Sequence, residues 1–206
     1  MKVVLGLLIL GLVGVSFQAQ LRLTVYYESL CPDSRRFIIN QLYPTINLLG
    51  GVNNEFLEAE FVPYGKANTT FVNGTFEFVC QHGRNECLGN MIHGCALAKL
   101  AKNESAAYIN CMMDSFNAPI DAEACAISLG LNYTRIGECY NNWEGPTILA
   151  SAGIRTHDLV PTLYYVPWIV YNDVWRVEDM IGSEQNLMNV ICQKLENSTR
   201  PTQCDQ

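Results

Sequence analysis

Apolar and polar positions follow two different spacings along the chain, which predict strands near its start and helices in its middle. The run Leu21–Tyr27 is rich in β-branched and aromatic residues and predicts a strand. Apolar residues at helical spacing follow as far as the pair Gly50-Gly51, with Pro44 as an expected kink. Residues 57–62 predict a second strand.

The next part of the chain predicts a hairpin and then a group of helices. Residues 69–78 read as two short strands around Asn73-Gly74, a pair that favours a type I′ turn. From about residue 85 to residue 160 the spacing of apolar positions becomes helical, and we interpret this stretch as a helical insertion. Helices are expected near residues 88–95, 105–116, 122–129 and 143–151.

The end of the chain predicts a second hairpin and a final helix. Residues 164–171 and 174–177 read as strands joined by the turn Asn172-Asp173, with Pro167 leading the hairpin. Ser183 is expected to cap a last helix that runs to about residue 195. This order of elements predicts an α/β protein with a thioredoxin-like fold and a disulfide-rich helical insertion, all in one domain over residues 20–206.

The first residues have the pattern of a targeting signal. Lys2 is followed by an apolar run over residues 3–15, which is about as long as the hydrophobic part of a signal peptide and too short to span a bilayer comfortably. We expect residues 1–19 to be a cleaved signal peptide, with an uncleaved anchor as the alternative. The mature protein is then expected outside the cell or in the lysosome, with no membrane span.

Glycosylation motifs agree with a route through the secretory pathway. Five N-x-[ST] motifs without a central proline begin at Asn68, Asn73, Asn103, Asn132 and Asn197. The net charge of −7, with only 13 Lys and Arg residues and no basic run, excludes nucleic acid and anionic membranes as attractive partners. The expected partners are therefore protein substrates, or a protein on a cell surface.

The number of cysteines is odd, and this leaves at least one thiol without an internal partner in an oxidising compartment. Of the nine cysteines, Cys31 stands alone near the expected mature N-terminus. A disulfide-linked dimer through Cys31 is the alternative to a free thiol. The other eight are expected to form four bridges whose pairing the sequence leaves open: Cys80, Cys87, Cys95, Cys111, Cys125, Cys139, Cys192 and Cys204.

One group of residues contains the types that bind metals. Cys80, Cys87 and Cys95 lie close in sequence to His82 and His93. Their spacing lacks the close C-x2-4-C pair of a structural zinc site. We therefore expect disulfides here, with no metal and no other cofactor.

The stretch from Cys80 to Cys95 reads C-Q-H-G-x2-E-C-x2-N-x4-C. This pattern resembles the signature of the gamma-interferon-inducible lysosomal thiol reductase (GILT) family. Residues 25–32 are similar to that family's redox segment and Val166-Pro167-Trp168 to its cis-proline segment, so that the resemblance covers nearly the whole mature chain. It implies a thioredoxin-like fold, a cis bond before Pro167 and a Cys-x-x-Cys pair that reduces protein disulfides at acidic pH. This chain departs from the pattern at Ser34.

The chemistry of disulfide exchange shows why that departure matters. Cys31 and Pro32 are expected at the start of a helix, where unpaired N–H groups and the helix dipole favour a thiolate, the nucleophile of the reaction. Arg35 and Arg36 are expected to assist. Ser34, expected on the solvent-facing side of the first turn, cannot resolve a mixed disulfide. Release then needs the substrate's own thiol or a small external thiol as reductant.

Two functions from different classes are consistent with these residues. The first is a thiol oxidoreductase that captures or isomerises protein disulfides through Cys31, with weak or lost reductase turnover because Ser34 replaces the resolving cysteine. Pro32, Val166 and Pro167 would border its bound substrate. The second is a secreted, non-catalytic binding protein that keeps the GILT scaffold and recognises a protein or a cell surface.

The odd number of cysteines predicts one reactive thiol in the mature protein, at Cys31. Peptide mapping after alkylation without prior reduction should find the label on Cys31 alone. Label on Cys111 or Cys204, with Cys31 protected, would refute this assignment. A bridge between two copies through Cys31 would instead be seen as a dimer that disappears on reduction.

Overall fold

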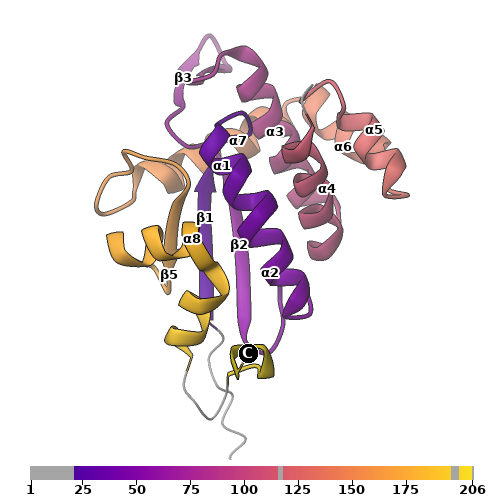
Figure 1. Cartoon of the computed structure of the whole chain (residues 1–206). Coiled ribbons are helices and arrows are strands. Elements are labelled where there is room, and N and C mark those ends of the chain that lie inside the picture. Colours follow the sequence, from indigo (N-terminus) through magenta and orange to yellow (C-terminus); the bar gives the residue numbers. More distant parts are fainter. Residues whose placement is uncertain (1–20, 116–117, 196–199, 206) are drawn as a thin grey trace, which may run out of the picture.

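A four-stranded mixed sheet forms the centre of the protein, in the order β2-β1-β5-β6 (Figure 1). The computed structural model describes residues 21–115, 118–195 and 200–205, so that the expected signal peptide at residues 1–19 lies outside the described residues. β1 (Leu21–Tyr27) pairs in parallel with β2 (Leu57–Pro63) and antiparallel with β5 (Trp168–Tyr171). β6 (Val174–Trp175) pairs with β5.

One helical segment of three parts comes after β1. α1 (Pro32–Phe37) continues through a π-helical turn, η1 (Ile38–Leu42), into α2 (Tyr43–Leu48). The wider turn ends at Leu42, two residues before Pro44, which lacks the N–H that an α-helix would use. The segment lies on the same face of the sheet as α8 (Val177–Lys194) (Figure 1). Its inward side chains are part of the main core: Phe37, Ile38, Leu42 and Ile46.

The predicted hairpin lies outside the main sheet. β3 (Asn68–Val72) and β4 (Thr75–Val79) pair antiparallel in a sheet of their own. Asn73 and Gly74 between them adopt positive φ angles of 51° and 83°, as a type I′ turn requires. The turn was therefore predicted correctly from two residues.

The helical insertion is present between β4 and β5. Its helices within the described residues are α3 (Arg84–Lys99), α4 (Lys102–Asp114), α5 (Ala122–Ser128), α6 (Tyr133–Asn141) and α7 (Glu144–His157). No helix in the described part of the chain is long and apolar enough to cross a membrane. The insertion has a small core of its own, in which side chains of α3, α4, α5 and α6 pack together.

α6 was missed by the sequence analysis, because a helix of nine residues offers too few apolar positions to establish a period. The available signal was the residue directly before it. Asn132 is the N-cap, and its side chain accepts a hydrogen bond from the N–H of Thr134 at 3.0 Å.

Four disulfides connect the expected eight cysteines. Cys80–Cys87 joins the end of β4 to the first turn of α3, and Cys95–Cys139 joins α3 to α6. Cys111–Cys125 joins α4 to α5, and Cys192–Cys204 ties α8 to the 3-10 turn η2 (Thr202–Asp205). Among the described residues, Cys31 is the cysteine outside a bridge.

β5 is shorter than the predicted strand, because residues 164–167 do not join the sheet. Trp168 begins the strand. Its fully buried ring stacks on that of Trp175, with 4.2 Å between the ring centroids. The bond between Val166 and Pro167 is cis, which confirms the expectation for this segment.

The predicted start of the last helix was wrong. α8 begins at Val177, well before Ser183, and Ser183 lies inside it. The Ser183 hydroxyl donates to the carbonyl of Asp179 at 2.6 Å and contacts the Tyr171 hydroxyl at 2.7 Å. A serine can bond back to the preceding turn in this way and so resembles a cap in sequence without being one. The acidic pair Glu178 and Asp179 marks the true first turn.

Most of the expected glycosylation acceptors lie on the described surface. Asn68 and Asn73 are exposed on the hairpin, and Asn103 and Asn132 are exposed in the insertion. Exposure is what an attached glycan needs. Asn197 lies outside the described residues.

His93 is fully buried in α3, against the end of β1. Its Nδ1 lies 3.0 Å from the hydroxyl of Tyr27, and the two ring centroids are 5.8 Å apart. Burial lowers the pKa of His93 to about 3, because desolvation disfavours the charged imidazolium. The folded protein therefore keeps His93 neutral at mildly acidic pH.

This buried imidazole predicts a loss of stability in acid. Between pH 6.5, near its unfolded pKa, and its folded pKa of about 3, the unfolded chain binds a proton at His93 that the folded protein does not. From pH 7 to pH 5, this group should lower the free energy of unfolding by about 2 kcal/mol. His93→Gln should remove that part of the pH dependence in urea unfolding curves. His157→Gln, at an exposed position, is the matched control. An unchanged pH dependence in His93→Gln would contradict the assignment.

Candidate active site

Cys31 stands where the loop after β1 enters the first helix. It is the N-cap of α1, with φ −65° and ψ 124°, and Pro32 occupies the first helical turn as predicted. The N–H of Arg35 donates to the Cys31 carbonyl at 3.0 Å, which closes this turn. The thiol therefore lies at the N-terminal end of the helical segment.

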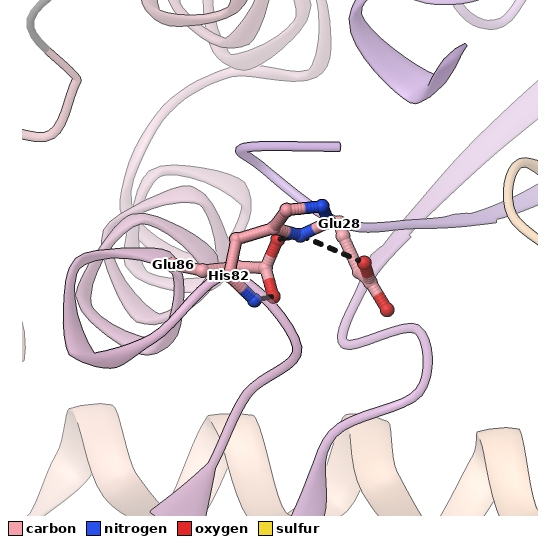
Figure 2. A group of neighbouring side chains, drawn as sticks. All are labelled: Glu28, His82 and Glu86. Atoms are coloured by element: carbon pink, nitrogen blue, oxygen red, sulfur yellow. Dashed lines mark hydrogen bonds and ion pairs between the residues drawn. The ribbon is translucent and has the colours of Figure 1, made fainter. Parts of the chain in front are cut away.

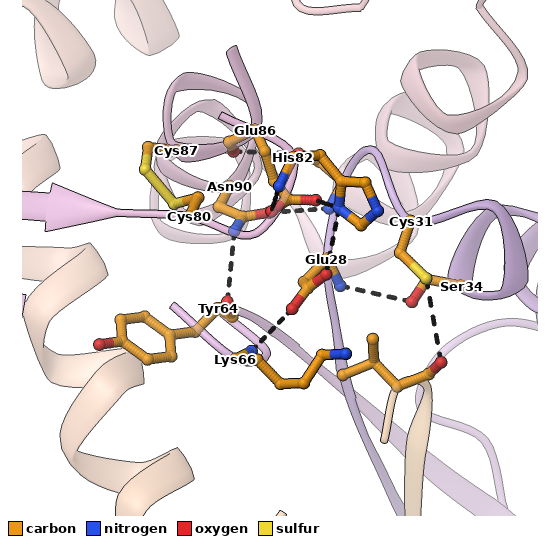
Figure 3. Close-up of polar contacts among 12 residues, drawn as sticks. Glu28, Cys31, Ser34, Tyr64, Lys66, Cys80, His82, Glu86, Cys87 and Asn90 are labelled. Atoms are coloured by element: carbon orange, nitrogen blue, oxygen red, sulfur yellow. Dashed lines mark hydrogen bonds and ion pairs between the residues drawn. A yellow bond between two sulfur atoms is a disulfide. The ribbon is translucent and has the colours of Figure 1, made fainter. Parts of the chain in front are cut away.

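The side chain of Cys31 points toward the cis-proline segment. It is 8% exposed, and its thiol donates to the carbonyl of Val166 at 3.9 Å (Figure 3). Residues that are 135 positions apart in sequence thus meet at one point. The structure brings Cys31, Val166 and Pro167 together in the way that a thioredoxin-like fold implies.

Ser34 does not face solvent, contrary to the expectation. Its side chain is fully buried, and its Oγ accepts a hydrogen bond from the N–H of Glu28 at 3.4 Å (Figure 3). Residues three apart lie on nearly the same side of a helix. Because Cys31 faces inward, Ser34 faces inward as well, against the loop that precedes Cys31.

The two arginines after Ser34 have other partners. Arg35 donates to the carbonyl of Ser115 at 2.7 Å, and Arg36 pairs with Asp33 at 2.7 Å. Both guanidinium groups are directed at these oxygens. The expected assistance of the arginines to Cys31 therefore finds no support in the geometry.

The sequence analysis missed Glu28, the residue directly after β1. This side chain is fully buried; its Oε1 accepts from the N–H of Lys66 at 2.7 Å, and its Oε2 faces Nδ1 of His82 at 3.3 Å (Figure 2). Burial raises the pKa of the Glu28 carboxyl, and the hydrogen bond from Lys66 opposes this shift. The available signal was a charged residue directly after a strand of buried residues.

His82 and Glu86 belong to the signature, but the sequence offered no role for either. The N–H of His82 donates to Glu86 Oε1 at 3.0 Å, and His82 Nδ1 lies 2.5 Å from Glu86 Oε2. The Glu86 side chain is fully buried, whereas that of His82 is 31% exposed. Together with Glu28 they form a cluster, the Glu28–His82–Glu86 cluster (Figure 3). The partly exposed imidazole connects this cluster to solvent.

Asn90, a further signature residue, attaches α3 to the loop before Cys31. Its Oδ1 accepts from the N–H of Ser29 at 2.8 Å, and the Ser29 hydroxyl donates to the carbonyl of Glu86 at 3.1 Å. The loop lies so close to α3 that a Cβ at Gly89 would be 2.5 Å from the Ser29 hydroxyl. The signature therefore positions the loop that carries Cys31.

The signature cysteines stabilise the same region. Cys80–Cys87 closes the short loop that carries His82, and Cys95–Cys139 ties α3 to α6. All three cysteines of the zinc alternative are thus oxidised, and none offers the thiolate that such a site needs.

Comparison with protein families gives a match over residues 22–129, to the family described as gamma interferon inducible lysosomal thiol reductase (GILT). The chain belongs to the GILT family. GILT-like protein 1 of Drosophila melanogaster is 33% identical, over 91% of this chain and 80% of its own length. The gamma-interferon-inducible lysosomal thiol reductase of Mus musculus is 32% identical, over 89% of this chain and 71% of its own length.

Solved structures with low sequence identity share the fold of this GILT-family chain. A thioredoxin-like oxidoreductase from Silicibacter pomeroyi DSS-3 has a TM-score of 0.54 at 10% identity, covering 80% of this chain and 84% of that one. DsbA of Chlamydia trachomatis has a TM-score of 0.55 at 14% identity, covering 77% and 79%. These likenesses concern the fold alone, and they confirm the predicted thioredoxin-like fold.

Glu28 requires a glycine beside it. Gly65 has a φ of +63°, and a Cβ there would collide with Cγ of Glu28 and lie 2.6 Å from its Oε1. Gly74, in the hairpin turn, also has a positive φ, but a Cβ there would meet nothing within 4 Å. The two glycines share the backbone requirement and differ in the space around them.

Gly65→Ala should therefore destabilise the GILT-family protein more than Gly74→Ala does. Both substitutions carry the cost of a positive φ, about 1 kcal/mol, and only the first adds overpacking, about 1–3 kcal/mol. Chemical unfolding at neutral pH measures both losses. Adding Glu28→Ala to Gly65→Ala should recover part of the extra loss. Equal losses at the two glycines would contradict the role assigned to Gly65.

Proposed function

We propose that this GILT-family chain is a thiol-disulfide oxidoreductase that acts on protein disulfides through one nucleophile, Cys31. The observation that carries the proposal is the meeting of a free thiol, a helix start and a cis-proline segment at one point. The family, whose description names a thiol reductase, supports the same chemistry.

In the first step, the Cys31 thiolate attacks one sulfur of a substrate disulfide. A bond forms between Cys31 and that sulfur, the substrate's S–S bond breaks, and its other sulfur leaves as a thiolate. The positive end of the helix dipole beside Cys31 favours the anionic sulfur in this exchange. In our proposal, Val166 and Pro167 border the bound substrate on one side and Pro32 on the other.

Ser34 determines how the mixed disulfide is released. A hydroxyl cannot form a disulfide, so the mixed disulfide persists until another thiol attacks it. The substrate's own cysteine then gives an isomerised substrate, whereas two equivalents of a small external thiol leave the substrate reduced and are themselves oxidised. An internal resolving thiol would attack the mixed disulfide at a large effective concentration. This protein has no such thiol at position 34, and we therefore expect slow reductase turnover.

One observation favours the alternative, a binding protein on the same scaffold. Cys31 is only 8% exposed, and a substrate disulfide must reach a sulfur that is largely covered. The same burial leaves little room for a bridge between two Cys31 residues, and it argues against a disulfide-linked dimer. The effect of Cys31→Ala separates the two functions, because only the oxidoreductase depends on the thiol.

We place the protein in the secretory pathway, with the lysosome or the exterior as its destination. Four disulfides suit an oxidising lumen, and the exposed acceptor asparagines suit a glycosylated chain. Relatives such as the lysosomal thiol reductase of Carassius auratus, 33% identical over 89% of this chain and 71% of its own length, favour the lysosome.

Ser34→Cys should raise reductase turnover by about tenfold or more, because the new thiol attacks the mixed disulfide from within the molecule. The assay is reduction of a denatured disulfide protein at acidic pH, with a small thiol as recycling reductant. Wild type should be slow and accumulate an adduct on Cys31. Exchange of oxygen for sulfur adds little volume, so the buried position should tolerate the change.

Ser34→Ala is the matched control, since it changes the same buried position without adding a thiol, and it should give no gain. Cys31→Ala should abolish both the adduct and the turnover. If folded Ser34→Cys shows no gain while Cys31 still reacts with an alkylating agent, the binding-protein function is the better one. If Cys31→Ala leaves every activity unchanged, the oxidoreductase proposal fails.

A further inference from the structure

The Glu28–His82–Glu86 cluster lies beside the Cys31 loop, and the steps proposed above for the thiol exchange do not use its side chains. We propose that this cluster binds one divalent transition-metal ion, and that Zn²⁺ is the ion its donor set fits best. The proposal rests on the positions of the three side chains and does not depend on the oxidoreductase function.

The three donors converge from different parts of the chain (Figure 2). Glu28 comes from the end of β1, His82 from the loop before α3, and Glu86 from the first turn of α3. One ligating atom of each lies within 4.8 Å of the other two. This convergence is what a metal site requires, because a single ion must reach all three atoms.

The distances between donors approach those around zinc. Bonds of about 2.0–2.2 Å in a tetrahedral site separate neighbouring ligand atoms by roughly 3.4 Å. His82 Nδ1 lies 3.3 Å from Glu28 Oε2, which matches this span. The 2.5 Å hydrogen bond from His82 to Glu86 Oε2 must open by about 1 Å, as the metal replaces the proton between them.

A second observation points to a ligand here. Oε2 of the fully buried Glu28 makes no hydrogen bond within the described part of the protein, although it is directed into the cluster. A buried carboxylate oxygen without a donor is costly. A cation between the three side chains would satisfy it and would also balance the charge of two neighbouring carboxylates.

Hydrogen bonds from the backbone orient both carboxylates for metal binding. Glu28 Oε1 accepts from the N–H of Lys66, and Glu86 Oε1 accepts from the N–H of His82, so each group turns its second oxygen toward the cluster. Outer contacts of this kind position the ligands of a metal site. The imidazole, at 31% exposure, gives an ion access from solvent, and a water is the fourth ligand that we expect.

The donor set decides which ion fits. One imidazole nitrogen with two carboxylate oxygens suits Zn²⁺ and its first-row neighbours, whereas Ca²⁺ and Mg²⁺ prefer oxygen alone. Cys31 is not part of the set, because its sulfur is directed at the Val166 carbonyl (Figure 3). Zn²⁺ also has no redox chemistry of its own that would oxidise a nearby thiol.

Calorimetric titration of the chelator-treated mature protein with ZnCl₂ should show one equivalent bound, and zinc should raise the melting temperature. Glu28→Gln and His82→Ala should each weaken binding by about tenfold or more. The partly exposed position of His82 keeps that variant folded, and circular dichroism checks both. His157→Ala, at an exposed histidine outside the cluster, is the matched control and should bind as wild type does.

The variant Cys31→Ser distinguishes zinc bound at the cluster from zinc bound by the thiol. It should keep the full zinc affinity of wild type. A Co²⁺ derivative should likewise lack a thiolate-to-metal charge-transfer band. Three results would overturn the proposal: folded wild type that binds no zinc, equal affinity in the cluster variants and wild type, or loss of binding in Cys31→Ser. Each of these results concerns metal binding alone. The zinc experiment can therefore be interpreted even if the proposed oxidoreductase activity is not found.

Discussion

Glu28 directly follows the central strand β1, and solvent does not reach its carboxylate. A buried carboxylate needs polar partners. The N–H of Lys66 donates to Oε1 of Glu28 and the ring of His82 lies beside its Oε2, so that the turn after β2 and the start of α3 converge on the loop before Cys31. Gly65 is required by the same constraint, because a side chain there would occupy the space of Glu28. The position of the thiol thus depends on a carboxylate three residues away.

The signature stretch is a structural unit built around that constraint. Its histidine and glutamate complete the cluster, Asn90 attaches the loop through Ser29, and Cys80–Cys87 closes the segment covalently. α3 thereby holds the loop from one side, while Val166 contacts the sulfur from the other. The scaffold around Cys31 is in place with Ser34 beside it, which is why a single-thiol chemistry without an internal resolving step is the function that we propose.

Local features of the sequence were sufficient for much of the fold. Composition identified β1, two turn residues identified the hairpin at Asn73-Gly74, and Pro32 identified the helix start. The odd number of cysteines predicted a free thiol without any knowledge of the pairing. These features were predictable because turn conformations, helix starts and strand patterns depend on residues that are neighbours in the chain.

By itself, then, the sequence determined the thiol, the family resemblance and the order of the elements apart from α6, whereas the tertiary structure alone decided which side chains meet. Ser34 was expected in solvent and lies inside, because the packing of α1 against the sheet sets the direction of its first turn. Glu28 and Glu86 come together because the end of one strand and the start of a later helix share the same edge of the fold. Such contacts join residues far apart in the chain, and no local pattern records them.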